Sequence, residues 1–331
     1  MLKEAENLVR QTNGDMEMLF PLNGGTFQAE WEHSYGNDVF NPSPEHFSDF
    51  VHGRTRIKRG EHKLLFGVTL NGVCPADCLD CPFGRTIMAK LYELETNRKL
   101  TLARPITPPE LQSALKEAHK IGVEQDILTP EESFSAGALL AGDPSYSPHI
   151  AELIATVAQI PGCDSCRWST IAADTLYNVL EAFRLGAVKA NVANPNHTAN
   201  FQVSVHSTNH ALRVQHTGVT RLLPLEEIAR AAKNLHGITG RKMSLSFVLH
   251  AGSVIDPEEL NRTFSPDDTI ISLRPIYSST THPIDPNRLI ALYSRLRNDG
   301  RDVVYMPPSQ DGTIDGRPIE LHNMRSQSLG L

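Results

Sequence analysis

Residues 64–81 read LLFGVTLNGVCPADCLDC, and the rest of the chain is interpreted outward from this stretch. Its first seven residues form a short apolar run of the kind that becomes a buried strand. Cys74, Cys78 and Cys81 follow in a CxxxCxxC pattern. Three thiolates so close together, at the carboxyl end of a strand, can surround one metal centre.

The number of thiols in this loop restricts the kind of metal centre. A structural zinc site uses four protein ligands, whereas the loop supplies three. A four-iron cluster also normally takes four thiolates, so with three of them one iron keeps an open coordination position. That position can bind the amino and carboxylate groups of a small ligand. The alternative is a zinc loop that takes its fourth ligand, such as a histidine, from elsewhere in the chain.

The composition is that of a globular protein, with 331 residues of which 40% are hydrophobic and 21% charged. The net charge of −7 disfavours a nucleic-acid partner, because phosphate binding needs a basic surface. No apolar run approaches the roughly 18 to 20 residues of a membrane helix, and the first residues lack the apolar segment of a secretory signal. The cysteines number five, which argues against a disulfide framework. We therefore expect a cytoplasmic protein.

Apolar runs alternate with helix-start signals along the chain. The predicted strands are 64–70, 137–141, 166–170, 201–206, 243–250 and 269–276. Helices are predicted to begin near Thr107, Ser147, Asp174, Pro224, Asp256 and Asp285, with Gly186 ending the third. This order predicts an α/β fold, an incomplete (β/α)6 TIM-like barrel whose working face lies at the carboxyl ends of the strands.

Three parts of the chain are distinguished by their composition. Residues 1–62 are polar and interrupted by Gly, Asn and Pro, and we interpret them as an N-terminal extension. Residues 63–280 hold the alternating strands and helices of the core barrel. Residues 281–331 are predicted to be a C-terminal helix and tail that close the substrate side.

The cysteine loop resembles that of the radical S-adenosylmethionine (SAM) superfamily. In that superfamily the three thiolates hold a [4Fe–4S] cluster, and SAM binds the remaining iron. One electron enters the sulfonium, and the resulting 5′-deoxyadenosyl radical removes hydrogen from the substrate. The resemblance implies the cluster and SAM as cofactors, and an electron donor such as flavodoxin or ferredoxin. Asp80 departs from the pattern, because the residue before the third cysteine is usually aromatic.

Three other strand ends resemble SAM-binding elements of the same superfamily. Ala141-Gly142-Asp143-Pro144 is similar to a Gly-Glu-Pro turn that holds the SAM ammonium group. Trp168-Ser169-Thr170 resembles a Ser-Thr element near the SAM carboxylate and ribose. Ser204-Val205-His206-Ser207, with Asn209 and Arg213, resembles an S-L-H-A-x-N-x-x-x-R stretch. The resemblance therefore assigns SAM binding to Gly142, Asp143, Ser169, Ser204, Val205 and His206.

The last of these stretches is particular to the dual-cysteine methyl synthases that act on adenines of ribosomal and transfer RNA. That branch carries its methyl group on a further cysteine near the C-terminus, but no cysteine follows Cys166 in this chain. We therefore expect a small-molecule substrate, for example a nucleoside, sugar or amino-acid intermediate. The alternatives are a radical SAM enzyme that modifies RNA, and a zinc or redox protein without radical chemistry. The fate of the substrate radical stays open.

Two lesser signals have both a functional and a structural interpretation. Cys163 and Cys166 are either a second cluster or redox site or a pair of packed thiols. Their place at the start of a strand favours packed thiols, because a strand rises about 3.3 Å per residue and puts them near the opposite rim. His250 and Arg274, at strand ends, either bind an anionic substrate or make structural hydrogen bonds. Residues 194–197 either line a substrate mouth or form a plain loop, which is favoured.

Overall fold

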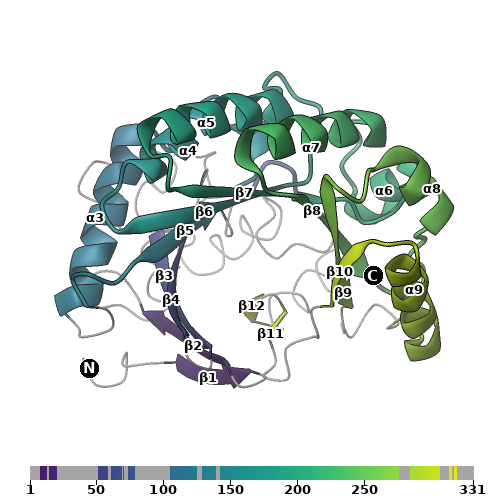
Figure 1. Ribbon diagram of the computed structural model, residues 1–331, viewed down its shortest axis with the longest axis horizontal. Helices are drawn as coiled ribbons and strands as arrows, with labels where there is room; N and C mark the ends of the chain where they lie inside the picture. The colour runs from purple at the N-terminus through teal and green to yellow at the C-terminus, as the bar shows by residue number, and fades with distance from the viewer. Residues whose placement is uncertain are drawn as a thin grey trace, which may run out of the picture.

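The computed structural model describes residues 8–12, 15–20, 51–58, 61–68, 70, 74–78, 105–124, 129–138, 142–275, 284–305, 313–314 and 317–318. A ten-stranded sheet runs through them, with its strands ordered β1 to β10 as they are in the chain. Figure 1 shows this sheet bent into an open arch, with helices along its convex outer side.

The sheet changes from antiparallel to parallel along the arch. Strands β1 (Leu8–Thr12), β2 (Asp15–Phe20), β3 (Val51–Lys58) and β4 (Glu61–Val68) pair in antiparallel fashion. From β4 onward the neighbours are parallel, through β5 (Phe134–Ala138), β6 (Cys163–Thr170), β7 (Thr198–Ser204), β8 (Met243–Leu249), β9 (Thr269–Pro275) and β10 (Asp302–Tyr305). The carboxyl ends of the parallel strands therefore lie along one edge.

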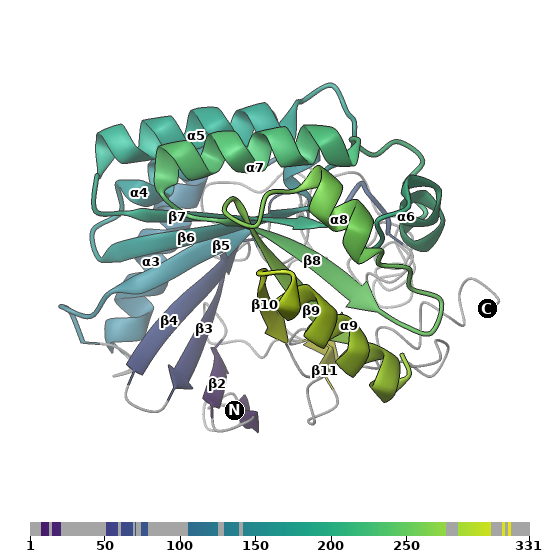
Figure 2. The same ribbon diagram turned by 45° about the vertical axis from the view of Figure 1, so that its right-hand side comes forward.

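Helices connect the parallel strands across the outer face. They are α3 (Pro108–Glu124), α4 (Ile150–Ala158), α5 (Val179–Ala193), α6 (His210–Thr217), α7 (Leu225–Thr239), α8 (Pro257–Thr263) and α9 (Pro286–Asn298), with a short 3₁₀ helix η3 (Pro144–Tyr146). Figure 2 shows α5 and α7 side by side over the outer face of the sheet. Within the described part of the chain, no helix is long and apolar enough to cross a bilayer.

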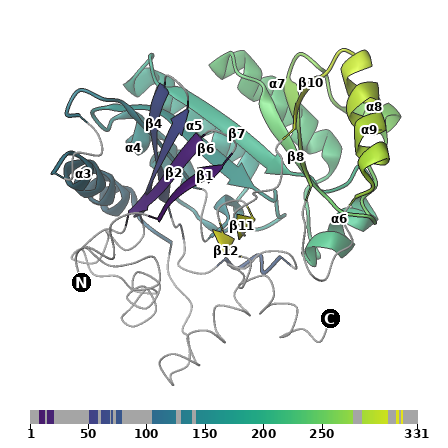
Figure 3. The ribbon, with the colours of Figure 1, turned by 90° about the horizontal axis from the view of Figure 1, so that it is seen from below.

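The predicted fold class is confirmed. The six predicted strands are β4 to β9, which are parallel, alternate with helices and do not close into a full barrel. The structure adds β10 at one edge and the three antiparallel strands at the other. Figure 3 shows β1–β4 and β8–β10 as two arms of the arch, with the pair β11 (Thr313–Ile314) and β12 (Arg317–Pro318) between them. The domain limits at 62/63 and 280/281 stay predictions.

The prediction that Gly186 ends a helix beginning near Asp174 is wrong. Helix α5 begins after Asn178, whose side chain accepts a hydrogen bond from the Glu181 N–H at 3.1 Å, and it continues to Ala193. Gly186 lies inside α5 where that helix approaches α4. A Cβ at this position would lie 2.6 Å from Ile154 Cδ1 and 3.2 Å from the Ala151 Cα. The glycine therefore permits close packing of two helices instead of ending one.

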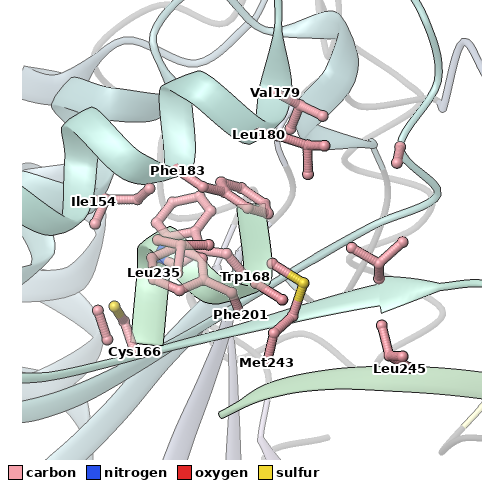
Figure 4. Packing of buried hydrophobic residues seen from close by; sticks show 14 of the residues in the cluster. Ile154, Cys166, Trp168, Val179, Leu180, Phe183, Phe201, Leu235, Met243 and Leu245 are labelled. Carbon is pink, nitrogen blue, oxygen red and sulfur yellow. The ribbon is translucent and has the colours of Figure 1, made fainter. Parts of the chain in front are cut away.

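The main hydrophobic core lies between the sheet and its helices. The Phe201 ring of β7 packs against Phe183 of α5, with ring centroids 4.8 Å apart, and Trp168 of β6 is fully buried nearby (Figure 4). Because successive side chains of a strand point to opposite faces, the residues between these core positions face the concave side of the arch. Ser169 and Gln202 are two such residues.

Candidate functional site

The cysteine loop follows β4 at the carboxyl edge of the parallel strands. Cys74 is buried and Cys78 is partly exposed. The turn between them is closed by a hydrogen bond from the Asp77 N–H to the Cys74 carbonyl at 3.3 Å, and Asp77 has a φ of +50°. A short polar side chain adopts this left-handed conformation more readily than most. Cys81 lies outside the described residues.

This loop packs against segments that follow three other strands. A small apolar cluster contains Cys74, Ala76, Ile171, Ala173, Val219 and Leu222, with Cys78, Tyr146 and Val214 packed against it. Within it, Ile171 and Ala173 follow β6, Tyr146 follows β5, and Leu222 lies after α6. A hydrogen bond from the Leu223 N–H to the Ala172 carbonyl, at 2.9 Å, joins two of these segments. The cysteine loop is thus brought to the same end of the sheet as the predicted SAM residues.

Tyr146 is a neighbour of the cysteines that the sequence did not single out. Burial, together with the charges of Asp143, Cys74 and Cys78, raises the pKa of its hydroxyl to about 12. The shift reinforces the protonated state that a tyrosine hydroxyl already has at neutral pH. No sequence signal identified it, because its position depends on how the turn after β5 meets the cysteine loop.

Asp143 joins the ends of β5 and β6. One carboxylate oxygen accepts hydrogen bonds from the Ser145 N–H (2.8 Å) and the Thr170 hydroxyl (2.7 Å), and the other accepts one from the Ile171 N–H (2.7 Å). The carboxylate is buried, and this burial raises its pKa even though the three bonds oppose the shift. Gly142 precedes it with a φ of +97°. These contacts hold two strand ends together, and contact of Gly142 or Asp143 with SAM stays a prediction.

The other predicted SAM residues lie on β6 and at the end of β7. Ser169 faces the concave side, and its hydroxyl accepts a hydrogen bond from Gln202 Nε2 at 3.0 Å. Ser204 ends β7, and the N–H groups of Val205 and His206 both donate to the Ser246 carbonyl, at 2.8 and 3.4 Å. His206 adopts a left-handed φ of +64°. The structure brings these residues to one edge, and their contact with SAM stays a prediction.

Basic side chains gather around His206. Burial lowers the pKa of His206 to about 4, with the charges of Arg213, His216 and His250 acting in the same direction. Arg213 is fully buried, and it donates to the carbonyls of Val205 (3.1 Å) and Leu223 (2.8 Å). The rings of His216 and His250 meet edge to face, with centroids 4.7 Å apart. Sequence reasoning missed His216, although its position three residues after Arg213 puts both on one side of α6.

Cys163 and Cys166 have a different environment near the amino end of β6. Both are free thiols buried in the main core, and the Cys163 thiol donates to the Ser165 carbonyl at 3.4 Å. Burial raises the pKa of both thiols, that of Cys166 to about 12. His197 is buried at the same end, with Nδ1 3.1 Å from the Cys163 carbonyl. These contacts are those of packed core residues and of a plain loop, the interpretations favoured from the sequence.

The donors in the cysteine loop fit an iron–sulfur cluster. Cysteine thiolates are the usual ligands of such clusters, and two of the three predicted ligands share one turn. Among the residues that the structure describes, no group of three or more His, Cys, Asp and Glu side chains is arranged to hold a metal ion. A cluster at Cys74 and Cys78 would need a further ligand, and the predicted one, Cys81, lies outside the described residues.

Comparison with known proteins finds a shared fold. No family model and no curated protein matches the chain. Among solved structures it is similar to a radical SAM methyltransferase from Sphaerobacter thermophilus, with a TM-score of 0.57, 17% identity, and coverage of 90% of this chain and 75% of that one. SuiB from Streptococcus suis matches with a TM-score of 0.42, 13% identity, and coverage of 72% and 47%. The first likeness shows that the chain has the same fold as that radical SAM methyltransferase.

Proposed function

We propose that this protein is a radical SAM enzyme that acts on a small molecule. Cys74, Cys78 and Cys81 would hold a [4Fe–4S] cluster, and SAM would bind beside it at the carboxyl edge of the sheet. The observation that carries the proposal is the position of the CxxxCxxC loop. It directly follows the first parallel strand of an open α/β barrel and packs on the segments after β5, β6 and α6.

When bound, such a cluster supplies one electron to SAM, and the adenosyl group released from SAM removes hydrogen from the substrate. The chain's own residues would bind and orient SAM and the substrate, and would exclude water from them. The apolar cluster that contains Cys74 covers one side of the loop, and Tyr146, whose hydroxyl is protonated at neutral pH, packs against the same cluster. His206 is uncharged at neutral pH because its pKa lies near 4, so it can hydrogen-bond a ligand without adding charge.

The substrate class follows from the composition and from a missing residue. The net charge of −7 disfavours RNA as the substrate, because RNA binding draws on a basic surface. The chain also lacks a cysteine after Cys166 that could carry a methyl group. A small metabolite therefore fits better than RNA, and flavodoxin or ferredoxin fits the role of electron donor.

Anaerobic reconstitution tests the proposal directly. The protein is loaded with iron and sulfide, iron and acid-labile sulfide are counted, and the reduced protein is incubated with SAM. We expect iron and sulfide in equal amounts and the release of 5′-deoxyadenosine. Candidate metabolites are then screened, in deuterated form, for transfer of deuterium into 5′-deoxyadenosine. Purified protein that holds zinc, and that takes up neither iron nor sulfide, would contradict the proposal.

A further inference from the structure

Three consecutive N–H groups follow β6, and each donates to an oxygen of a buried side chain. The pairs are Ile171 with Asp143 Oδ2 (2.7 Å), Ala172 with Thr170 Oγ1 (2.9 Å) and Ala173 with Ser145 Oγ (3.1 Å). The three accepting side chains, which we call the Asp143 network, come from the turn after β5 and from the end of β6, and they are at most 9% exposed. Contacts from two strand ends therefore fix the path of residues 171–173.

The oxygens of the Asp143 network also bond to one another. The Thr170 hydroxyl donates to Asp143 Oδ1 at 2.7 Å. Because a hydroxyl has a single proton, the contact of 2.9 Å between the Ser145 and Thr170 hydroxyls takes its proton from Ser145. Loss of the Thr170 hydroxyl would therefore leave the Ser145 hydroxyl and the Ala172 N–H without their acceptor. Buried donors that lose their acceptor are costly.

Ala172 is held in an uncommon backbone conformation. Its φ is +58°, in the left-handed region that a residue with a Cβ rarely adopts. The N–H of Ala172 is bound by Thr170, and its carbonyl accepts a hydrogen bond from the Leu223 N–H at 2.9 Å. Strained backbone of this kind persists only where the surrounding contacts determine it. The bond to Thr170 is one of the contacts that keep residues 171–173 in place.

Residues 171–173 contribute to the apolar packing around the cysteine loop. Ile171 and Ala173 belong to the same small cluster as Cys74, whose exposed fraction is 8%. Ala173 also forms an antiparallel bridge with Leu222, another member of that cluster. The Asp143 network therefore fixes the backbone of two residues that share an apolar cluster with Cys74.

We propose that the Asp143 network positions residues 171–173 so that their apolar side chains keep water from Cys74 and from the iron that it would bind. This inference rests on the proposed function, which makes Cys74 a ligand of an iron–sulfur cluster. It goes further because it assigns a positioning role to Ser145 and Thr170. Such a role matters to the chemistry, since access of water affects the reduction potential of a cluster.

Alkylation of Cys74 in the folded, cluster-free chain tests the positioning role without a cluster. Thr170→Val keeps the shape of the side chain and removes the hydroxyl. We expect iodoacetamide to label Cys74 about tenfold faster in this variant, because the lost hydrogen bonds make local opening of residues 171–173 more frequent. Cys166 is buried in the main core and should stay unmodified, which reports that the chain as a whole is folded. Mass spectrometry of the peptides measures both rates.

The reconstituted protein gives a second measurement, which does not depend on turnover. An iron chelator should remove iron from Thr170→Val about tenfold faster than from the wild type, because water and chelator reach the cluster more readily. At a fixed potential a larger fraction of the cluster should be reduced, since water stabilises the more negative reduced state. Thr170→Ser keeps the hydroxyl and should restore both values.

Thr239→Val is the matched control. The Thr239 hydroxyl donates to the Leu235 carbonyl at 2.8 Å and accepts the Arg241 N–H at 3.1 Å, at the end of α7 that precedes β8. The same atoms are exchanged in this variant, but at the amino end of the parallel strands. The fold should therefore lose stability, while the labelling of Cys74 and the release of iron should match those of the wild type.

Ser145→Ala keeps the test decisive if Thr170→Val does not fold. It removes the acceptor of the Ala173 N–H, and it should speed the labelling of Cys74 by a smaller factor. The inference is wrong if Cys74 is labelled at the wild-type rate in every variant of the network that folds. It is also wrong if Cys166 becomes reactive together with Cys74, because the variants would then loosen the whole chain.

Failure of the proposed function gives a different result. A wild type that takes up neither iron nor sulfide contradicts that function, whereas the labelling of Cys74 still shows whether the Asp143 network shields this thiol. A wild type that loads a cluster and releases 5′-deoxyadenosine, with Thr170→Val identical to it in labelling and in iron release, contradicts only the inference.

Discussion

Cys74 and Cys78 lie on a turn at the carboxyl edge of the sheet, whereas Cys163 and Cys166 lie in β6 toward its amino end. The first two border a small apolar cluster and leave Cys78 partly exposed, while the second two are sealed in the main core. A thiol must lose its proton to bind a metal, and burial raises the pKa of the second pair. Both pairs are closely spaced in the sequence. They differ in where they lie relative to the ends of the strands.

The largest expected effect comes from replacing one cysteine of each pair. Cys78→Ala should lose nearly all reconstituted iron and 5′-deoxyadenosine, because a cluster ligand is gone. Cys166→Ala should keep both and lose only about 1–2 kcal/mol of stability from the small cavity it leaves in the core. Iron and sulfide analysis, assay of 5′-deoxyadenosine and denaturant unfolding measure these quantities. Loss of iron from Cys166→Ala, with Cys78→Ala unaffected, would reverse the assignment of the two pairs.

Alkylation compares the reactivity of the two cysteine pairs without mutation. Because the pKa of Cys166 is raised from 9.0 to about 12, its thiolate fraction at pH 8 is lower by about a thousandfold than that of an unperturbed thiol. In the folded, cluster-free chain, iodoacetamide should label Cys78 and leave Cys163 and Cys166 unmodified. Mass spectrometry of the peptides measures the labelling, and guanidinium chloride should make all of them reactive. Rapid labelling of Cys166 in the folded chain would show that the core is open there.

The sequence was sufficient to predict the parallel part of the fold. Buried parallel strands read as short apolar runs, and helix-start signals such as Asp256-Pro257 and Asp285-Pro286 separate them; both aspartates do cap helices. Strand β10 was missed because a four-residue edge strand is too short to produce a pattern. Gly186 was misjudged because helix ends and close helix crossings both select glycine, and only the position of α4 distinguishes the two.

The sequence identified candidate residues at each strand end, but it did not show which residues of different elements come together. Each strand end could be found from its motif, so Cys74, Asp143 and His206 were identified. Tyr146, His216 and Gln202 were not, because their importance depends on which elements meet in space. The network from Ser169 through Gln202 to Arg274 joins three strands, β6, β7 and β9. Periodicity within any one strand could say only that these residues face inward.

Asp143 and Asp164, which lie toward the carboxyl and amino ends of the parallel strands, provide the next test. Asp143→Asn should destabilise the fold by about 1–3 kcal/mol, because an amide nitrogen would face a buried N–H or hydroxyl donor. The neutral amide offsets part of this cost, since burial already disfavours the charge of Asp143. Asp164→Asn is the control, because Asp164 is exposed, and its effect should stay within about 0.5 kcal/mol. Denaturant unfolding at pH 7 measures both, and equal effects would show that Asp143 does not join β5 to β6.

The smallest expected effect is the pH dependence due to His206. Its pKa is near 4 in the folded chain and near 6.5 when unfolded, so the unfolded state binds the proton more readily. Stability should therefore fall as the pH drops from about 6.5 toward 5, by an amount on the order of 1–2 kcal/mol. His206→Asn should remove this loss, because asparagine tolerates the left-handed backbone and does not titrate.

His197 provides the matching variant at the amino end. Burial lowers its pKa as well, but the hydrogen bond to the Cys163 carbonyl and the charge of Asp164 oppose that shift. His197→Asn should therefore change the pH dependence less than His206→Asn does, in denaturant unfolding of the cluster-free chain between pH 7 and pH 4.5. If the two variants changed it equally, the basic groups around His206 would contribute nothing beyond burial.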